Sequence, residues 1–189
     1  MVVGLRVFLA SLLLCSWVHA EEVDHQAKVE RFHGILTQTM QQSDLEQRVE
    51  LVEPAVTALF DLERIASLSL GSNWKDLNDL QRDEFVAVLL KLITATYAER
   101  FSSFNGQTFT TESVQQVRRG TVVRTKLKTV DREVQLDYFF RQGKVFNVAA
   151  DGVSDLSLRR ADYKSVIANE GYAGLVNNLQ RQILEAGQQ

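Results

Sequence analysis

The sequence predicts an α+β fold in which helices pack on one face of a curved antiparallel sheet, forming a single domain with an apolar cavity. Residues 24–104 place apolar side chains at three- and four-residue steps, which is the period of an amphipathic helix. Residues 108–150 instead alternate apolar and polar side chains, as half-buried strands do, and the helical period returns after Gly152. A chain of 189 residues without internal repeats or linkers is expected to form one core. Helices that flank a strand meander in the sequence are typical of this fold class.

The first twenty residues are similar to a secretory signal rather than to part of a folded domain. Arg6 is followed by the apolar run Val7–Val18, which is shorter than the roughly 20 residues that span a bilayer. Val18-His19-Ala20 then offers the aliphatic and small side chains that a signal peptidase recognises. We therefore predict export, cleavage after Ala20 and a mature domain of residues 21–189. An uncleaved anchor is the alternative.

The composition of the mature chain narrows the possible partners. Cleavage removes Arg6 and Cys15, which leaves 20 basic and 24 acidic residues, a net charge of −4, and no cysteine. An exported domain without disulfides depends on its core alone for stability. The acidic balance argues against nucleic acid, which requires a basic surface, and against permanent residence on an anionic membrane.

The first helices are predicted from apolar faces and from residues that start or stop a helix. Asp61 is a suitable N-cap and Gly71 a suitable stop. Pro54 is tolerated in the first turn of a helix but not in the interior of one. Together these signals predict helices over Asp24–Met40, Leu45–Val52, a third segment with Pro54 in its first turn, and Leu62–Leu70.

A longer helix is predicted from Asn78, its N-cap, to about Phe104, with Gln81 at the capping-box position. It is apolar nearly all round, so we expect it to be buried on most sides. It is either a central core helix or a helix with one side facing protein and the other facing a ligand tail. Two C-terminal helices are predicted over Leu158–Ala168 and Leu175–Leu184, separated by the Gly171–Gly174 loop.

Four strands are predicted over 108–117, 121–129, 134–141 and 144–150, with Gln142-Gly143 as a hairpin turn. Strand alternation places one apolar set on a common face: Val123, Thr125, Leu127, Val134, Leu136, Tyr138, Phe140, Phe146, Val148 and Ala150. The opposite face carries a basic stripe of Arg124, Lys126 and Lys128. This stripe is either a solvated strand surface or a docking site for an acidic partner or lipid headgroup.

Few residues suggest catalysis or metal binding. His25 and His33 lie eight residues apart on the first helix with no cysteine beside them, so we predict surface histidines and no metal site. The chain has no nucleophile elbow and no phosphate-cradling glycine loop. Glu133 and Asp137 are expected to face solvent or basic neighbours. We therefore predict no catalytic residue and no cofactor.

The apolar sheet face and the apolar helix together exceed what a small core requires, and such concave apolar space is where small-molecule sites form. Each residue of this surface could equally be an ordinary core position. The predicted cavity lining consists of Leu89, Ile93, Tyr97, Phe101, Val123, Leu127, Val134, Leu136, Tyr138, Phe140, Phe146 and Val148.

Three segments carry a recognisable pattern in their order and spacing. The first runs from Phe60-Asp61 to Leu70-Gly71-Ser72-Asn73-Trp74. The second runs from Gln81-Arg82-Asp83-Glu84-Phe85 through Thr96-Tyr97-Ala98-Glu99-Arg100-Phe101 to Gly106. The third is Asp151-Gly152-Val153-Ser154, followed by Arg160 and Tyr163. From about Phe60 to the C-terminal helix, the chain therefore resembles the MlaC, or toluene-tolerance, family of periplasmic lipid carriers. Its Thr96-Tyr97-Ala98 and Asp155-Leu156-Ser157-Leu158-Arg159-Arg160 are most similar to the HpnM-like branch associated with hopanoid gene clusters.

The resemblance implies a monomeric periplasmic shuttle that holds a phospholipid or hopanoid with its acyl chains inward. Such proteins exchange lipid with an inner-membrane ABC transporter complex and an outer-membrane lipoprotein complex, and they catalyse no covalent chemistry. Gly143 and Asn147 depart from the tryptophan and aspartate of many relatives. Two other functions stay open: an NTF2-like small-molecule enzyme, which needs an acid or base in its cavity, and a structural periplasmic adaptor with a filled core.

Overall fold

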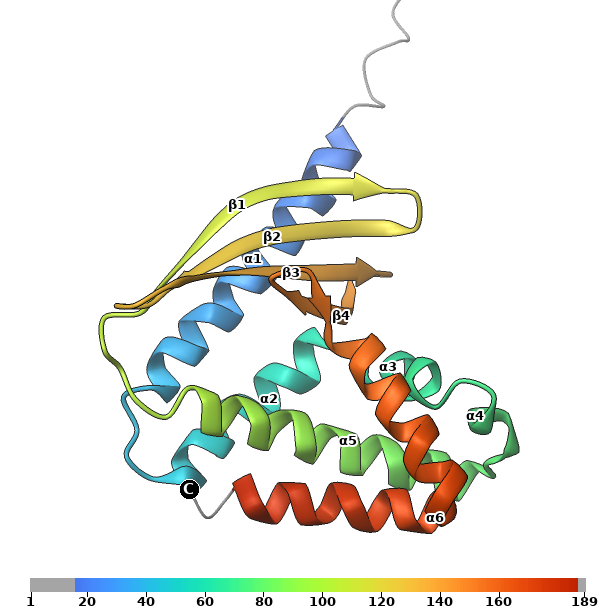
Figure 1. Ribbon diagram of the computed structural model, residues 1–189. Coiled ribbons are helices and arrows are strands. Elements are labelled where there is room, and N and C mark those ends of the chain that lie inside the picture. The colour runs from blue at the N-terminus through green and yellow to red at the C-terminus, as the bar shows by residue number, and fades with distance from the viewer. Residues whose placement is uncertain (1–15, 187–189) are drawn as a thin grey trace, which may run out of the picture.

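The computed structural model describes residues 16–186, which form the predicted α+β domain (Figure 1). The helices are α1 (Ser16–Thr39), α2 (Leu45–Leu59), α3 (Leu62–Leu70), α4 (Asn73–Asp76), α5 (Asp79–Arg100) and α6 (Asp155–Ala186). The strands are β1 (Thr108–Val117), β2 (Gly120–Lys128), β3 (Glu133–Arg141), β4 (Lys144–Ala150) and β5 (Val153–Ser154).

Most of the predicted signal segment, residues 1–15, lies outside the described residues, so cleavage after Ala20 stays a prediction. Within residues 16–186, no helix combines the length and apolar character that are needed to cross a bilayer.

The predicted helix ends are confirmed where a local cap defines them. The Asp61 carboxylate accepts a hydrogen bond from the Arg64 backbone N–H, and Gly71 ends α3 with a φ of +59°. Asn78 and Gln81 form a complete capping box at the start of α5. These ends could be predicted because each depends on a few neighbouring residues.

One helix prediction was wrong. Pro54 does not begin a third helix but lies inside the single helix α2, on its exposed side. The carbonyl of Glu50 loses its usual N–H partner there, but an exposed carbonyl can bond to water instead. By contrast, the predicted division of the C-terminal region into two helices is confirmed, because α6 consists of two helices that meet at a kink at Gly171, where φ is +71° and the backbone is not helical. The break is shorter than the predicted Gly171–Gly174 loop.

The sheet is an antiparallel meander in the order β1-β2-β3-β4-β5. Its inner face, the side that contacts the helices, follows the predicted alternation on β2 and β3, because Val123 pairs with Tyr138 and Leu127 with Val134. On β4, the predicted inward face is correct at Val148, which pairs with Tyr138. It is wrong nearer the β3–β4 turn. A bulge there places Val145 opposite Phe140 and leaves Phe146 without a partner in the ladder.

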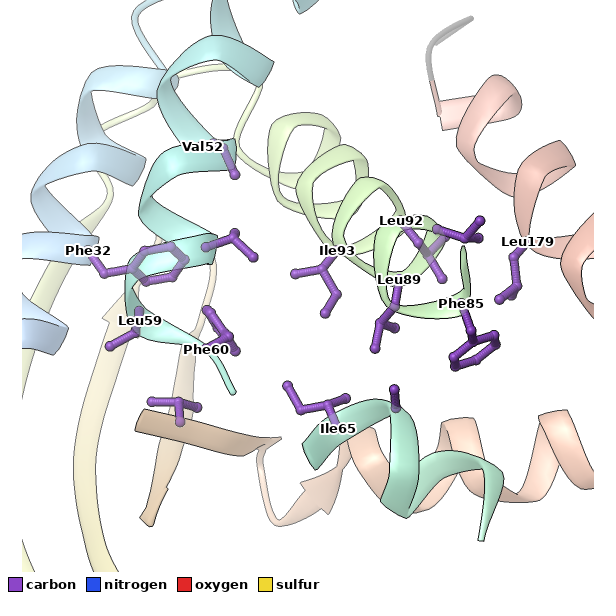
Figure 2. Close-up of a cluster of buried hydrophobic side chains, with 14 of the residues drawn as sticks. Phe32, Val52, Leu59, Phe60, Ile65, Phe85, Leu89, Leu92, Ile93 and Leu179 are labelled. Carbon is purple, nitrogen blue, oxygen red and sulfur yellow. The ribbon is translucent and has the colours of Figure 1, made fainter. Parts of the chain in front are cut away.

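Figure 1 shows the sheet as one layer over the helices, with α1 running diagonally across it. Helix α5 packs mainly against α2, α6 and α3 rather than against the sheet. In Figure 2, Leu89 points towards Ile65 of α3, and Phe85 and Leu92 lie on the side of α5 that faces Leu179 of α6. The predicted central core helix is therefore surrounded by other helices.

Gly120 provides a test of the hairpin geometry. Its φ is +145°, and a Cβ at this position would collide with the backbone carbonyl oxygen of Phe140. We expect Gly120→Ala to lower the free energy of unfolding by about 2–3 kcal/mol. The control is Gly106→Ala, where φ is also positive but no atom lies near the new Cβ, so only about 1 kcal/mol is expected. Equal losses of unfolding free energy in the two variants, measured by urea titration, would contradict this account.

Candidate functional site

The two histidines are buried, which corrects the prediction that they lie on the surface. His25 is 3% exposed and its ring lies 4.4 Å from that of Phe140. His33 is 4% exposed, stacks on Phe109 at 4.1 Å, and its Nε2 lies 3.0 Å from the Tyr138 hydroxyl. Both rings therefore contact the inner face of the sheet and attach α1 to it.

Burial determines the protonation states of His33 and Tyr138. It lowers the pKa of His33 from 6.5 to about 4, an effect that Glu30 partly opposes. It also raises the pKa of the Tyr138 hydroxyl well above its usual value. At neutral pH the two groups form a neutral hydrogen-bonded pair, and His33 is a weak base.

A pocket of about 280 Å³ opens beside this pair, between α1 and β1, and is lined by Glu30, His33, Gly34, Thr37, Phe109 and Thr111. Its polar groups already bond to one another. The Thr111 hydroxyl and the Gln26 amide both donate to Glu30 Oε1, at 3.0 and 2.8 Å, and the Thr37 hydroxyl donates to the His33 carbonyl. The pocket is lined by no serine or cysteine. Of these hydrogen bonds, the one from Thr111 to Glu30 joins β1 to α1, and the other two lie within α1.

A second pocket, of about 330 Å³, lies on the other side of α1, between α1 and α2. We call it the α1–α2 groove. Small side chains on α2, Ala55 and Ala58, face larger ones on α1, which leaves the space unfilled. The groove is lined by Phe32, Ile35, Leu51, Pro54, Ala55, Ala58 and Leu59, with Lys28 and Arg31 also lining it. It is the more apolar of the two pockets.

The structure does not bring the twelve predicted lining residues together around either pocket. Six are buried and belong to the core: Leu89, Ile93, Phe101, Val123, Tyr138 and Phe140. The other six are half-buried: Tyr97, Leu127, Val134, Leu136, Phe146 and Val148. Contact of these residues with a lipid stays a prediction.

Two groups can be distinguished within this set. Val123, Tyr138 and Phe140 face the inside of the sheet, where Tyr138 and Phe140 contact the histidines of α1. Leu127 and Leu136 are on the same face but pack only at the edge of the core. The predicted space between sheet and helices is thus occupied in part by α1 itself.

Sequence reasoning missed Phe109, Val145 and the residues of the α1–α2 groove. Val145 is fully buried and forms a bridge with Phe60, but the apolar dipeptide Val145-Phe146 does not reveal which residue faces inward. The groove depends on how two helices cross, which no local pattern in the sequence indicates.

The acidic and basic side chains on the outer face of the sheet interact with one another. Lys126 Nζ lies 2.8 Å from Glu112 and 3.9 Å from Glu133, and Arg124 lies 3.9 Å from Asp137. Glu133 and Asp137 therefore do have basic neighbours, and the basic stripe is largely neutralised. Within the part of the chain that the structure describes, no group of three His, Cys, Asp or Glu residues could hold a metal ion.

Comparison with known proteins identifies relatives of the sequence and of the fold. The family model described as MlaC protein matches residues 26–181. Among solved structures, a phospholipid-binding protein from Ralstonia solanacearum, determined in complex with a phospholipid, superposes with a TM-score of 0.77. It shares 20% sequence identity over 87% of this chain and 99% of its own, a level that shows a common fold. No curated protein sequence matches the chain.

Proposed function

Because this chain belongs to the MlaC family, we propose that it is a periplasmic carrier that binds a membrane lipid, either a phospholipid or a hopanoid. The family match carries this proposal, and the phospholipid in the related Ralstonia structure supports it.

The size of the ligand determines what the protein must do to bind it. A two-chain lipid has on the order of 30 methylene groups, each worth about 0.8 kcal/mol when buried, so moving it from a bilayer into water costs on the order of 20 kcal/mol. A methylene occupies about as much space as a water molecule, roughly 30 Å³, so the lipid requires on the order of 900 Å³. Neither the 280 Å³ pocket nor the 330 Å³ groove holds it.

We infer that the lipid-bound protein differs from this structure by a separation of α1 from the sheet. The two pockets flank α1 on opposite sides, so packing is incomplete beside this helix. Moving α1 away would expose Val123, Tyr138 and Phe140 and join them to the half-buried Leu127 and Leu136. The inner-face sheet residues of the predicted lining would then form one apolar surface, whereas Leu89 of α5 would stay packed towards Ile65 of α3 (Figure 2).

The finer parts of the proposal follow from the family resemblance. The carrier would be a monomer that exchanges its lipid with an inner-membrane ABC transporter complex and an outer-membrane lipoprotein complex. It would reach the periplasm by the signal segment cleaved after Ala20. The hopanoid alternative depends on the similarity of Thr96-Tyr97-Ala98 to the HpnM-like branch.

Mass spectrometry of an organic extract tests the proposal directly. We expect protein purified from the periplasm without detergent to yield close to one lipid per chain. The headgroup and ring system of that lipid distinguish a phospholipid from a hopanoid. Gently purified protein that yields no stoichiometric lipid, and takes up none from vesicles, would contradict the proposed function.

An enzyme is the second candidate because the 280 Å³ pocket contains Glu30 and His33. His33 is a weak base at neutral pH, since its pKa is lowered to about 4. Glu30 Oε1 already accepts hydrogen bonds from Gln26 and Thr111. A chemically altered ligand recovered with wild-type protein but not with His33→Gln would favour the enzyme over the carrier. A structural adaptor would bind no lipid in either experiment.

A further inference from the structure

Basic side chains gather at one end of the sheet. In the antiparallel meander, the β1–β2 turn and the β3–β4 turn lie at the same end, because Thr121 pairs with Phe140. The first turn carries Arg118 and Arg119, and the second is bounded by Arg141 and Lys144. All four side chains belong to exposed residues.

Three helices meet the β3–β4 turn at this end through basic side chains. Lys28 Nζ of α1 donates to the Gly143 carbonyl at 3.1 Å, and Lys144 Nζ donates to the Thr57 carbonyl of α2 at 3.3 Å. Arg64 of α3 donates to Gln142 Oε1 at 3.0 Å, but its charge is paired with Asp61. We define the basic end as Lys28, Arg31, Arg118, Arg119, Arg141 and Lys144.

Apolar surface lies among these charges. The α1–α2 groove begins at Lys28 and Arg31 and continues over Ile35 and Ala58, with a volume of about 330 Å³. At the tip of the β1–β2 hairpin, Val117 is 47% exposed next to Arg118. A cationic rim around exposed aliphatic groups is the chemistry of surfaces that bind at the headgroup level of an anionic bilayer.

We propose that the basic end docks on the surface of a bilayer that contains anionic phospholipids, and that the α1–α2 groove admits an acyl chain there. The docking goes beyond the proposed function, whereas the entry of the chain rests on it. An acidic protein partner would also match the positive charges. The unpaired apolar groove and the exposed valine favour the bilayer.

The charge distribution makes this docking reversible. The whole chain has a net charge of −3, so the rest of the molecule opposes long residence on an anionic membrane while one end is attracted to it. Each basic residue near such a surface strengthens binding by about fivefold, and the effect decreases with ionic strength.

Vesicle flotation tests the docking without reference to lipid carriage. Full-length mature protein is mixed with vesicles of phosphatidylcholine alone, or of phosphatidylcholine with phosphatidylglycerol, at low and at physiological salt. We expect binding only to the anionic vesicles. The triple variant Arg118→Gln/Arg119→Gln/Arg141→Gln should bind on the order of a hundredfold more weakly.

A matched control removes three exposed basic side chains near the opposite end of the sheet: Arg100→Gln/Lys128→Gln/Arg132→Gln. It changes the net charge equally and should bind nearly as well as the wild type. An equal loss of vesicle binding in both triple variants would overturn the proposal. So would a failure of the wild-type protein to bind anionic vesicles. In the second case an acidic protein becomes the better partner for the basic end.

A variant of the α1–α2 groove separates the entry of an acyl chain from the docking of the protein on the bilayer. Ala58 is exposed, and Ala58→Trp should fill the α1–α2 groove without affecting the core. We expect it to float with anionic vesicles as the wild type does but to take up labelled lipid at least tenfold more slowly. Wild-type uptake by this variant would overturn the entry route. No uptake by any variant, the wild type included, would instead count against the lipid carrier.

Discussion

Leu136→Asp is expected to abolish lipid copurification and to lower the free energy of unfolding by about 3 kcal/mol. Leu136 lies on the inner face of the sheet, where it pairs with Thr125 and Ala150 and packs against the core. A carboxylate at this position would enter an apolar surface, which opposes both folding and the binding of hydrocarbon. Lipid per folded chain, measured after gel filtration, and a urea titration give the two results.

The control places the same charge on the opposite face of the sheet. Ser113 pairs with Arg124 on the outer face, so Ser113→Asp gains a basic neighbour and should retain both stability and lipid. If Leu136→Asp remains folded and carries as much lipid as the wild type, Leu136 does not line the binding site. The twelve-residue lining would then have to be redrawn around the α1–α2 groove.

Local signals in the sequence predicted the parts of the fold that depend on neighbouring residues. The capping box of Asn78 and Gln81 is one example, and the alternation of β3 is another. Pro54 shows the limit of such reasoning, because a proline on the exposed side of α2 is tolerated once tertiary packing stabilises the rest of the helix.

The candidate site was harder to predict because it depends on which elements meet. The apolar sequence of α5 indicated burial correctly, but the surfaces that bury it are α2, α3 and α6 rather than the sheet. Likewise, His33 is polar enough to suggest a surface position, and only the arrangement of Phe109 and Tyr138 opposite α1 accounts for its burial. The sequence therefore predicted an apolar inner face of the sheet but not that α1 covers it.

The burial of His33 predicts a marked loss of stability in mild acid. In the unfolded chain His33 binds a proton as the pH falls below 6.5, whereas in the folded chain its lowered pKa keeps it neutral until about pH 4. Between these values the unfolded state binds more protons, so the free energy of unfolding falls as the pH falls. The contribution is fully present above pH 6.5, and about 3 kcal/mol is lost by pH 4.

His33→Gln removes this titration while retaining a hydrogen-bonding group that can reach the Tyr138 hydroxyl. We expect the difference in unfolding free energy between pH 7 and pH 4 to be about 3 kcal/mol smaller in this variant than in the wild type. Tyr138→Phe is the control, because it removes the same hydrogen bond but leaves the histidine in place, so its pH dependence should persist. Parallel pH profiles for wild type and His33→Gln would show that His33 titrates equally in both states. Any loss of stability in acid would then come from groups other than His33.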